Sequence, residues 1–131
     1  MLASELIADL EPLDGALPVL LASRPNQTKG LPSNEATVTP FGELLVDDAG
    51  SDIDIRPTQN GPGLSVEEVL EALRLQPQAA SYFVNGVESE VLLPDGRAVR
   101  STQPALGILA TETSVLLLLG SAETWPTVQF Q

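Results

Sequence analysis

The sequence predicts one α+β domain over residues 1–131, with a small mixed or antiparallel sheet and two short helices. Three observations support this prediction. A chain of 131 residues normally builds a single hydrophobic core. Two segments repeat apolar residues at helical spacing, and several short apolar runs are bounded by residues that favour turns.

Both predicted helices are amphipathic. Residues 3–11 place leucines and an isoleucine on one face, and Pro12 follows them, which ends the helix. Residues 65–75 are the more clearly marked helix. Ser65 and Glu68 have the spacing of a capping box, in which each side chain accepts a hydrogen bond from the backbone amide of the other.

Short apolar runs predict the strands. We expect them at residues 17–22, 37–46, 51–56, 80–84, 87–93 and 115–119. Residues 47–50 form a polar turn that ends in glycine, and Asn85-Gly86 is the dipeptide typical of a tight type I′ hairpin. A further turn is expected at residues 94–96.

The composition limits the classes of partner and of chemistry. Eighteen acidic and six basic residues give a formal charge of −12, and there is no histidine or cysteine. This charge disfavours binding to nucleic acid or to an anionic membrane, and it favours a basic protein surface. Without a basic signal segment or a long apolar run, the chain is expected in the cytoplasm, or in a particle assembled there.

Two segments are predicted to contact neighbouring molecules. Residues 23–35 have the composition of a mobile loop, and residues 121–131 form a C-terminal arm that carries the only tryptophan. The candidate interaction residues are Arg24, Asn26, Lys29, Trp125, Val128 and Phe130.

The order of elements carries a family resemblance. The runs IDIRP, LSVEEVLEAL and SYFVNG between residues 52 and 86 resemble the ubiquitin-like β-grasp proteins of the sulfur-carrier type. This resemblance implies a β-grasp fold. Carriers of that family act through a C-terminal Gly-Gly, whereas this sequence ends in residues 128–131, VQFQ, so the carrier activity is not implied. The opening SELIADLEPLDGALPVLLA looks like the start of small uncharacterised bacterial and phage proteins.

Acidic residues are the only candidates for a metal site. Asp47, Asp48, Asp52 and Asp54 surround a turn and offer oxygen ligands for a hard cation, but their spacing does not match an EF-hand, and carboxylates at turns are usually solvated. Whether they bind a cation is left open, and we predict no metal site and no cofactor.

Other acidic residues have simpler explanations. Glu88 and Glu90 alternate with apolar residues, so they are expected on the solvent face of one strand, where charge deters pairing between strand edges.

Catalysis is not indicated by any motif. A serine nucleophile would need a lysine base, and Lys29 lies in the predicted loop. Residues 61–63, Gly-Pro-Gly, lack the Lys-Ser/Thr ending of a phosphate loop. We therefore predict no catalytic residue.

Two functional interpretations follow. The first is a non-catalytic structural or protein–protein interaction module, a component of a phage particle or a similar assembly. The alternative is an acidic inhibitor or adaptor that binds a basic surface on a partner protein.

Overall fold

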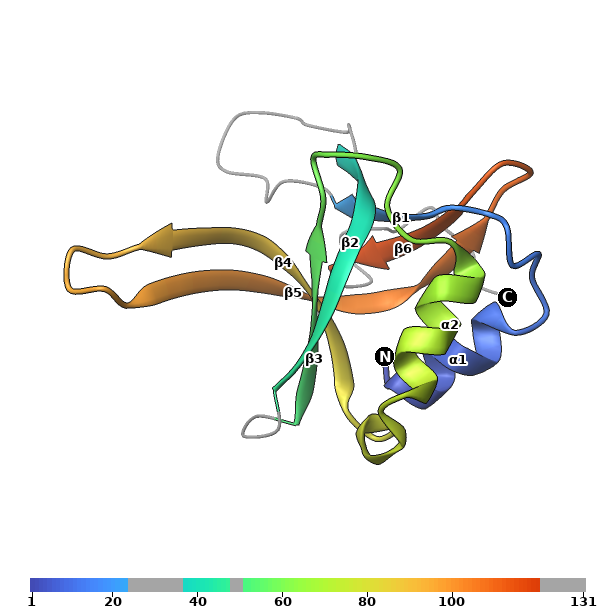
Figure 1. Cartoon of the computed structure of the whole chain (residues 1–131), viewed down its shortest axis with the longest axis horizontal. Coiled ribbons are helices and arrows are strands. Elements are labelled where there is room, and N and C mark those ends of the chain that lie inside the picture. Colours follow the sequence, from blue (N-terminus) through green and yellow to red (C-terminus); the bar gives the residue numbers. More distant parts are fainter. Residues whose placement is uncertain (24–36, 48–50, 121–131) are drawn as a thin grey trace.

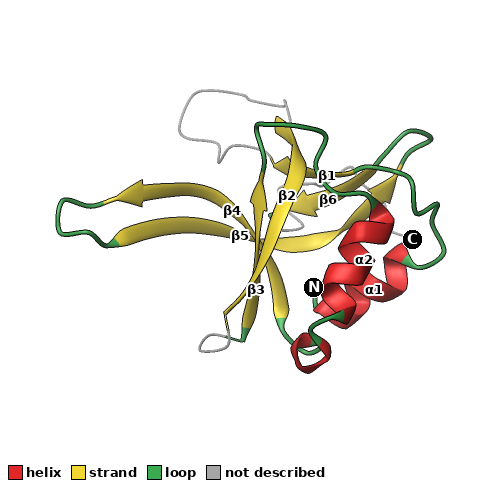
Figure 2. Ribbon diagram, in the orientation of Figure 1, coloured by secondary structure: helices red, strands yellow, loops and turns green. Residues whose placement is uncertain are grey.

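The computed structural model describes residues 1–23, 37–47 and 51–120. In these residues, six strands form a closed barrel and two helices pack against it (Figures 1 and 2). The elements in chain order are α1 (Ala3–Leu10), β1 (Val19–Ser23), β2 (Thr37–Asp47), β3 (Asp52–Pro57), α2 (Val66–Arg74), a short 3₁₀ turn (Pro77–Ala79), β4 (Phe83–Leu92), β5 (Ala98–Ala110) and β6 (Val115–Leu119).

The predicted open α+β sheet with a β-grasp arrangement is wrong. Strand is the most abundant secondary structure in the described residues, and the strands close in the order β1-β2-β3-β4-β5-β6. β1 pairs with β6 in parallel from Val19↔Val115 to Ser23↔Leu119, and this pairing closes the barrel. β3 and β4 are also parallel and are joined by a crossover that contains α2, whereas the other neighbouring strands are antiparallel.

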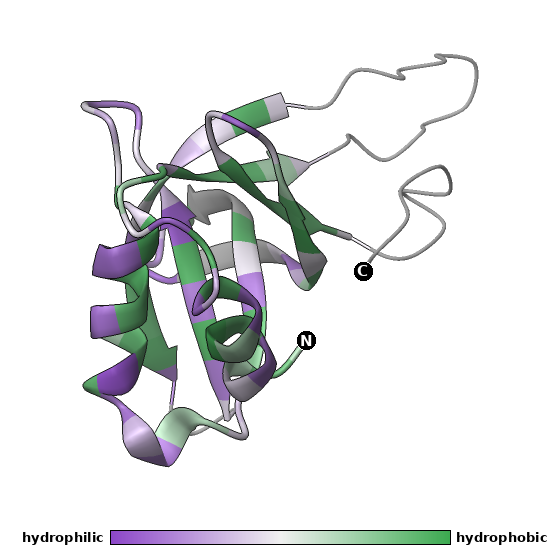
Figure 3. Ribbon diagram, turned by 90° about the vertical axis from the view of Figure 1, so that its right-hand side faces the viewer, coloured by the Kyte–Doolittle hydropathy of each residue, from purple (hydrophilic) through white to green (hydrophobic). Residues whose placement is uncertain are grey.

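One hydrophobic core joins the helices to the barrel. All six strands and both helices contribute side chains to it. The largest fully buried side chains are those of Leu6, Leu10, Phe41, Ile53, Ile55, Leu117 and Leu118. Apart from residues 88–91 and 98–101, whose side chains are not described, no polar or charged residue in the described part of the chain is buried. Figure 3 shows hydrophilic and hydrophobic residues alternating along the helices, as expected where only one face meets the core.

The predicted α2 helix is confirmed to within a residue at each end. The Ser65 hydroxyl accepts a hydrogen bond from the Glu68 amide at 3.3 Å, and the Glu68 carboxylate accepts one from the Ser65 amide at 3.1 Å. These two bonds satisfy amides that have no partner inside the helix. Val66, Val69 and Leu73 then face the core.

The predicted hairpin of residues 37–46 and 51–56 is confirmed as β2 and β3. Its register runs from Phe41↔Pro57 to Asp47↔Asp52, with an irregularity between Phe41 and Glu43. Residues 48–50 of the predicted turn lie outside the described residues. Ser51 has a φ of 55°, so the described end of the turn already enters the left-handed region.

The predicted tight hairpin at Asn85-Gly86 is wrong, because β4 runs straight through this dipeptide. Gly86 pairs with Ile55 of β3 on one side and with Gln103 of β5 on the other. A Cβ on Gly86 would lie only 2.7 Å from Leu119 Cδ2. The glycine therefore lets the Leu119 side chain pack against the strand, which is a reason for glycine that does not involve a turn.

The next predicted turn, at residues 94–96, is confirmed. Gly96 has a φ of +87°, and its amide donates to the Leu93 carbonyl at 3.0 Å. The turn joins β4 to β5, so the true hairpin is much longer than the predicted one. The segments 24–36 and 121–131, which include nearly all of the predicted loop and the whole predicted C-terminal arm, lie outside the described residues.

The helices of the described residues are too short or too polar to cross a membrane.

Candidate functional site

The sequence-predicted interaction residues are not placed by the structure. All six fall in the two undescribed segments: Arg24, Asn26, Lys29, Trp125, Val128 and Phe130. Their roles stay predictions, and the same holds for the hypothetical serine–lysine pair that would need Lys29. The candidate site is therefore sought among the described residues.

The most prominent surface feature is the outer part of the β4–β5 hairpin. β4 pairs with β3 only as far as Gly86, and β5 begins to pair with β6 only at Ala105. Between these points, residues 87–92 and 98–102 pair with each other and with no other described strand. Figure 1 shows this two-stranded ribbon extending away from the barrel. We call residues 87–102 the hairpin arm.

The tip of the hairpin arm is held by local bonds and exposes an apolar residue. The Leu93 amide donates to the Arg97 carbonyl at 2.7 Å, and the Arg97 guanidinium forms an ion pair with Asp95 at 2.6 Å. Leu92, the last residue of β4, is 74% exposed. The strand therefore presents a large aliphatic side chain to the outside just before the turn.

The hairpin arm has a charge balance unlike that of the whole chain. It contains Glu88, Glu90 and Asp95 against Arg97 and Arg100, so three acidic and two basic residues give a net charge of −1, compared with −12 for the chain. The charges are also separated by strand. β4 contains two glutamates and no basic residue, whereas β5 contains Arg100 and no acidic residue.

Three of the four aspartates considered for cation binding gather beside the base of the hairpin arm. Asp47 and Asp52 are cross-strand partners, and Asp54 pairs with Leu45 on one side and with Asn85 on the other. Together they line a shallow hollow of about 640 Å³ on the outside of β2, β3 and β4. Asp48 lies outside the described residues.

The described carboxylates of the hollow are not arranged as a metal site by themselves. Among the described residues, no group of three or more carboxylates is arranged to hold a metal ion. What the hollow offers is negative charge beside apolar surface, because Leu45 is 40% exposed and Phe83, on the neighbouring strand, is 58% exposed.

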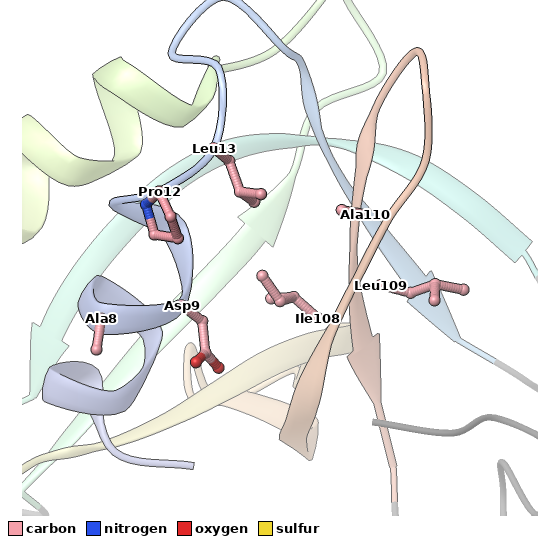
Figure 4. A pocket seen from close by; sticks show the side chains of 7 residues that line it. All are labelled: Ala8, Asp9, Pro12, Leu13, Ile108, Leu109 and Ala110. Carbon is pink, nitrogen blue, oxygen red and sulfur yellow. The ribbon is translucent and has the colours of Figure 1, made fainter. Parts of the chain in front are cut away.

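A second hollow lies between α1 and β5 (Figure 4). It has a volume of about 400 Å³, and its lining comes mainly from aliphatic residues, with Asp9 as its charged member. Figure 4 shows Leu13 and Ile108 extending into the space between the helix and the strand, while Leu109 points away from it. Asp9 is the single titratable side chain among these lining residues.

Comparison of the chain with protein-family models, with curated proteins and with solved structures finds no match. The function is therefore argued from the geometry alone.

The hairpin arm is the feature that the sequence analysis missed. The Asn85-Gly86 dipeptide suggested that the chain turned back early, so residues 87–93 were expected to pair with residues 80–84. The available signal was the second turn, Pro94-Asp95-Gly96, which lies between two runs that contain valine. The strand before this turn extends back to Phe83 without a break.

Proposed function

We propose that this chain is a non-catalytic structural or protein–protein interaction module, and that it contacts its partner through the hairpin arm. The setting we propose is an assembly such as a phage particle, located in the cytoplasm or built there. The observation that carries the proposal is a long two-stranded ribbon that extends beyond the barrel and pairs with no other described strand.

The exposure of the hairpin arm supports this proposal. A two-stranded ribbon is marginally stable in water on its own, and a third strand or another surface adds hydrogen bonds and apolar contacts. A partner that packs against the hairpin arm would thus stabilise a segment that lies outside the barrel. This argument favours contact with another molecule at residues 87–102.

Shortening the hairpin arm tests the proposal. Ser89 and Ser101 are cross-strand partners, so residues 90–100 can be replaced by the dipeptide Asn-Gly, which forms a two-residue turn at that register. The shortened chain should keep the pairings that close the barrel. Circular dichroism and thermal unfolding of the shortened chain measure whether it stays folded. In light scattering, we expect the intact chain to be associated with itself or with a co-purifying protein. The shortened chain should be a monomer with no protein bound to it.

A shortened chain that keeps every contact of the intact chain would contradict the proposal. The barrel surface, and not the hairpin arm, would then be the interface.

The acidic inhibitor or adaptor is the second candidate function. The hollow lined by Asp47, Asp52 and Asp54 favours it, because a basic surface on another protein would meet both charge and exposed apolar area there. The two candidates differ in salt dependence. Binding through the hollow should weaken steeply as salt increases, whereas contacts made by backbone hydrogen bonds and by Leu92 should weaken less.

A further inference from the structure

We infer that Asn60 is a site of spontaneous deamidation in the folded protein, whereas Asn85 is protected, although a glycine follows both residues. The group that reacts is the side-chain amide of Asn60, and the co-reactant is water. The inference goes beyond the proposed function, because Asn60 lies in the loop between β3 and α2 and not in the hairpin arm.

Deamidation of an asparagine that precedes a glycine proceeds through a five-membered ring. The backbone nitrogen of the glycine gives its proton to hydroxide and bonds to the side-chain carbonyl carbon of the asparagine. Ammonia then leaves with a proton from water, which regenerates the hydroxide. A second water opens the ring: its attack at the side-chain carbonyl carbon gives aspartate, and its attack at the backbone carbonyl carbon gives isoaspartate. No oxidant or reductant is needed.

Local structure decides how readily this ring can close. The backbone must rotate until the glycine nitrogen meets the side-chain carbonyl carbon of the asparagine, and a glycine has no Cβ to obstruct the approach. In an exposed loop this rotation disturbs few contacts. In a strand that pairs on both sides, the rotation breaks hydrogen bonds of the sheet, so the reaction must wait for local opening. The same dipeptide is therefore expected to react at different rates in the two settings.

Asn60 lies in a setting that permits the rotation. Asn60 and Gly61 are both exposed, and their loop lies at the top of the view in Figure 1. No atom lies within 4 Å of a Cβ built on Gly61. Within the described part of the chain, the Gly61 amide donates no hydrogen bond. The Thr58 hydroxyl donates to the Asn60 carbonyl at 3.0 Å, and because this bond is exposed, water can replace it at little cost.

Asn85 lies in the opposite setting. It belongs to β4, where it pairs with Asp54 of β3 and with Pro104 of β5. Gly86 is buried and pairs with a residue on each of the same two neighbouring strands. A Cβ on Gly86 would lie 2.7 Å from Leu119 Cδ2, so the space beside this glycine is filled. Ring closure at Asn85 would therefore disrupt the sheet at the base of the hairpin arm.

The fold is expected to tolerate the change at Asn60. The Thr58 amide donates to the Pro40 carbonyl at 3.0 Å, and the Leu64 amide donates to the Phe41 carbonyl at 2.9 Å. These bonds hold the loop against β2 on both sides of Asn60. The product adds one negative charge, and its isoaspartate form lengthens the backbone by one carbon between the two anchors. The midpoint of thermal unfolding should therefore stay the same.

Mass spectrometry of the aged protein tests the inference. The folded chain is kept in mildly alkaline buffer, and samples are digested after glutamate at mildly acidic pH, where ring closure is slow. The fragments of residues 44–67 and 72–88 carry Asn60 and Asn85 separately. We expect the first fragment to gain the mass difference between an amide and an acid more than about tenfold faster than the second, because the second requires opening of β4. A protein-isoaspartate methyltransferase with S-adenosylmethionine should methylate the first fragment.

Two controls separate the effect of structure from that of the dipeptide. In urea, where the chain is unfolded, the two fragments should change at similar rates, because a glycine follows the asparagine in both. In the folded Gly61→Ala variant, the change at Asn60 should slow several-fold, because the alanine Cβ obstructs ring closure while no neighbouring atom is displaced.

Two results would overturn the inference. One is equal rates at Asn60 and Asn85 in the folded chain, and the other is an Asn60 that stays intact in the folded chain while it reacts in urea. Neither result bears on the proposed function, which is tested by shortening the hairpin arm.

Discussion

Replacement of Phe41 with alanine is expected to lower the free energy of unfolding by about 3 to 5 kcal/mol. The Phe41 side chain is 0% exposed and belongs to the core that joins the barrel to the helices. Its removal leaves a cavity where β2 packs on the other core residues. Domains of this size are stable by about 5 to 15 kcal/mol, so the variant should unfold at a much lower urea concentration.

Phe83→Ala is the matched control, because the same atoms are removed at a site that is 58% exposed. We expect it to cost about 1 kcal/mol or less, since little buried area is lost. Equal losses for the two variants would contradict the position of Phe41 in the core.

Replacement of Gly63 with alanine is expected to cost about 2 to 4 kcal/mol. Gly63 has a φ of +74°, and an added Cβ would lie 2.7 Å from both the Phe41 carbonyl oxygen and the Pro40 Cβ. The next amide, of Leu64, donates to the same carbonyl at 2.9 Å. A side chain at Gly63 would therefore push the loop away from β2 and weaken the bond that anchors it just before α2.

Gly61→Ala separates strain from crowding. Gly61 has a φ of +96°, but no atom lies within 4 Å of its added Cβ. This variant should show only the conformational cost of a left-handed alanine, about 1 to 2 kcal/mol. Urea denaturation of the two variants side by side measures the difference, and a Gly61→Ala loss as large as that of Gly63→Ala would contradict the close approach to β2.

Local elements of this fold could be predicted because their signals lie within a few residues. Ser65 and Glu68 mark the start of α2, and the turn between β2 and β3 joins two apolar runs that do pair. Gly86 shows the limit of such signals. A glycine after an asparagine is typical of a turn, but here the reason for glycine is Leu119, which is distant in sequence.

Closure of the barrel could not be predicted for the same reason. It depends on the parallel pairing of β1 with β6, two strands from opposite ends of the described chain. Each is an apolar run that would fit an open sheet or a barrel equally well, and only the whole set of pairings decides between them. The resemblance to β-grasp proteins reflected the order of the elements and not their pairing.

The candidate site was not predicted from the sequence. Charge and the lack of catalytic motifs predict an interaction protein, and the composition directed attention to residues 23–35 and 121–131. The hairpin arm depends on how far β4 extends beyond β3, which is a property of pairing.

Hydrogen exchange of the backbone amides in the hairpin arm tests the central claim most directly. The protein is compared at a concentration where light scattering finds it associated and at a dilution where it is monomeric. If the hairpin arm is the interface, amides in residues 87–92 and 98–102 exchange more slowly in the associated protein, while those of β6 exchange equally in both. Equal exchange of the arm amides in the two samples would contradict the claim that the hairpin arm is the interface.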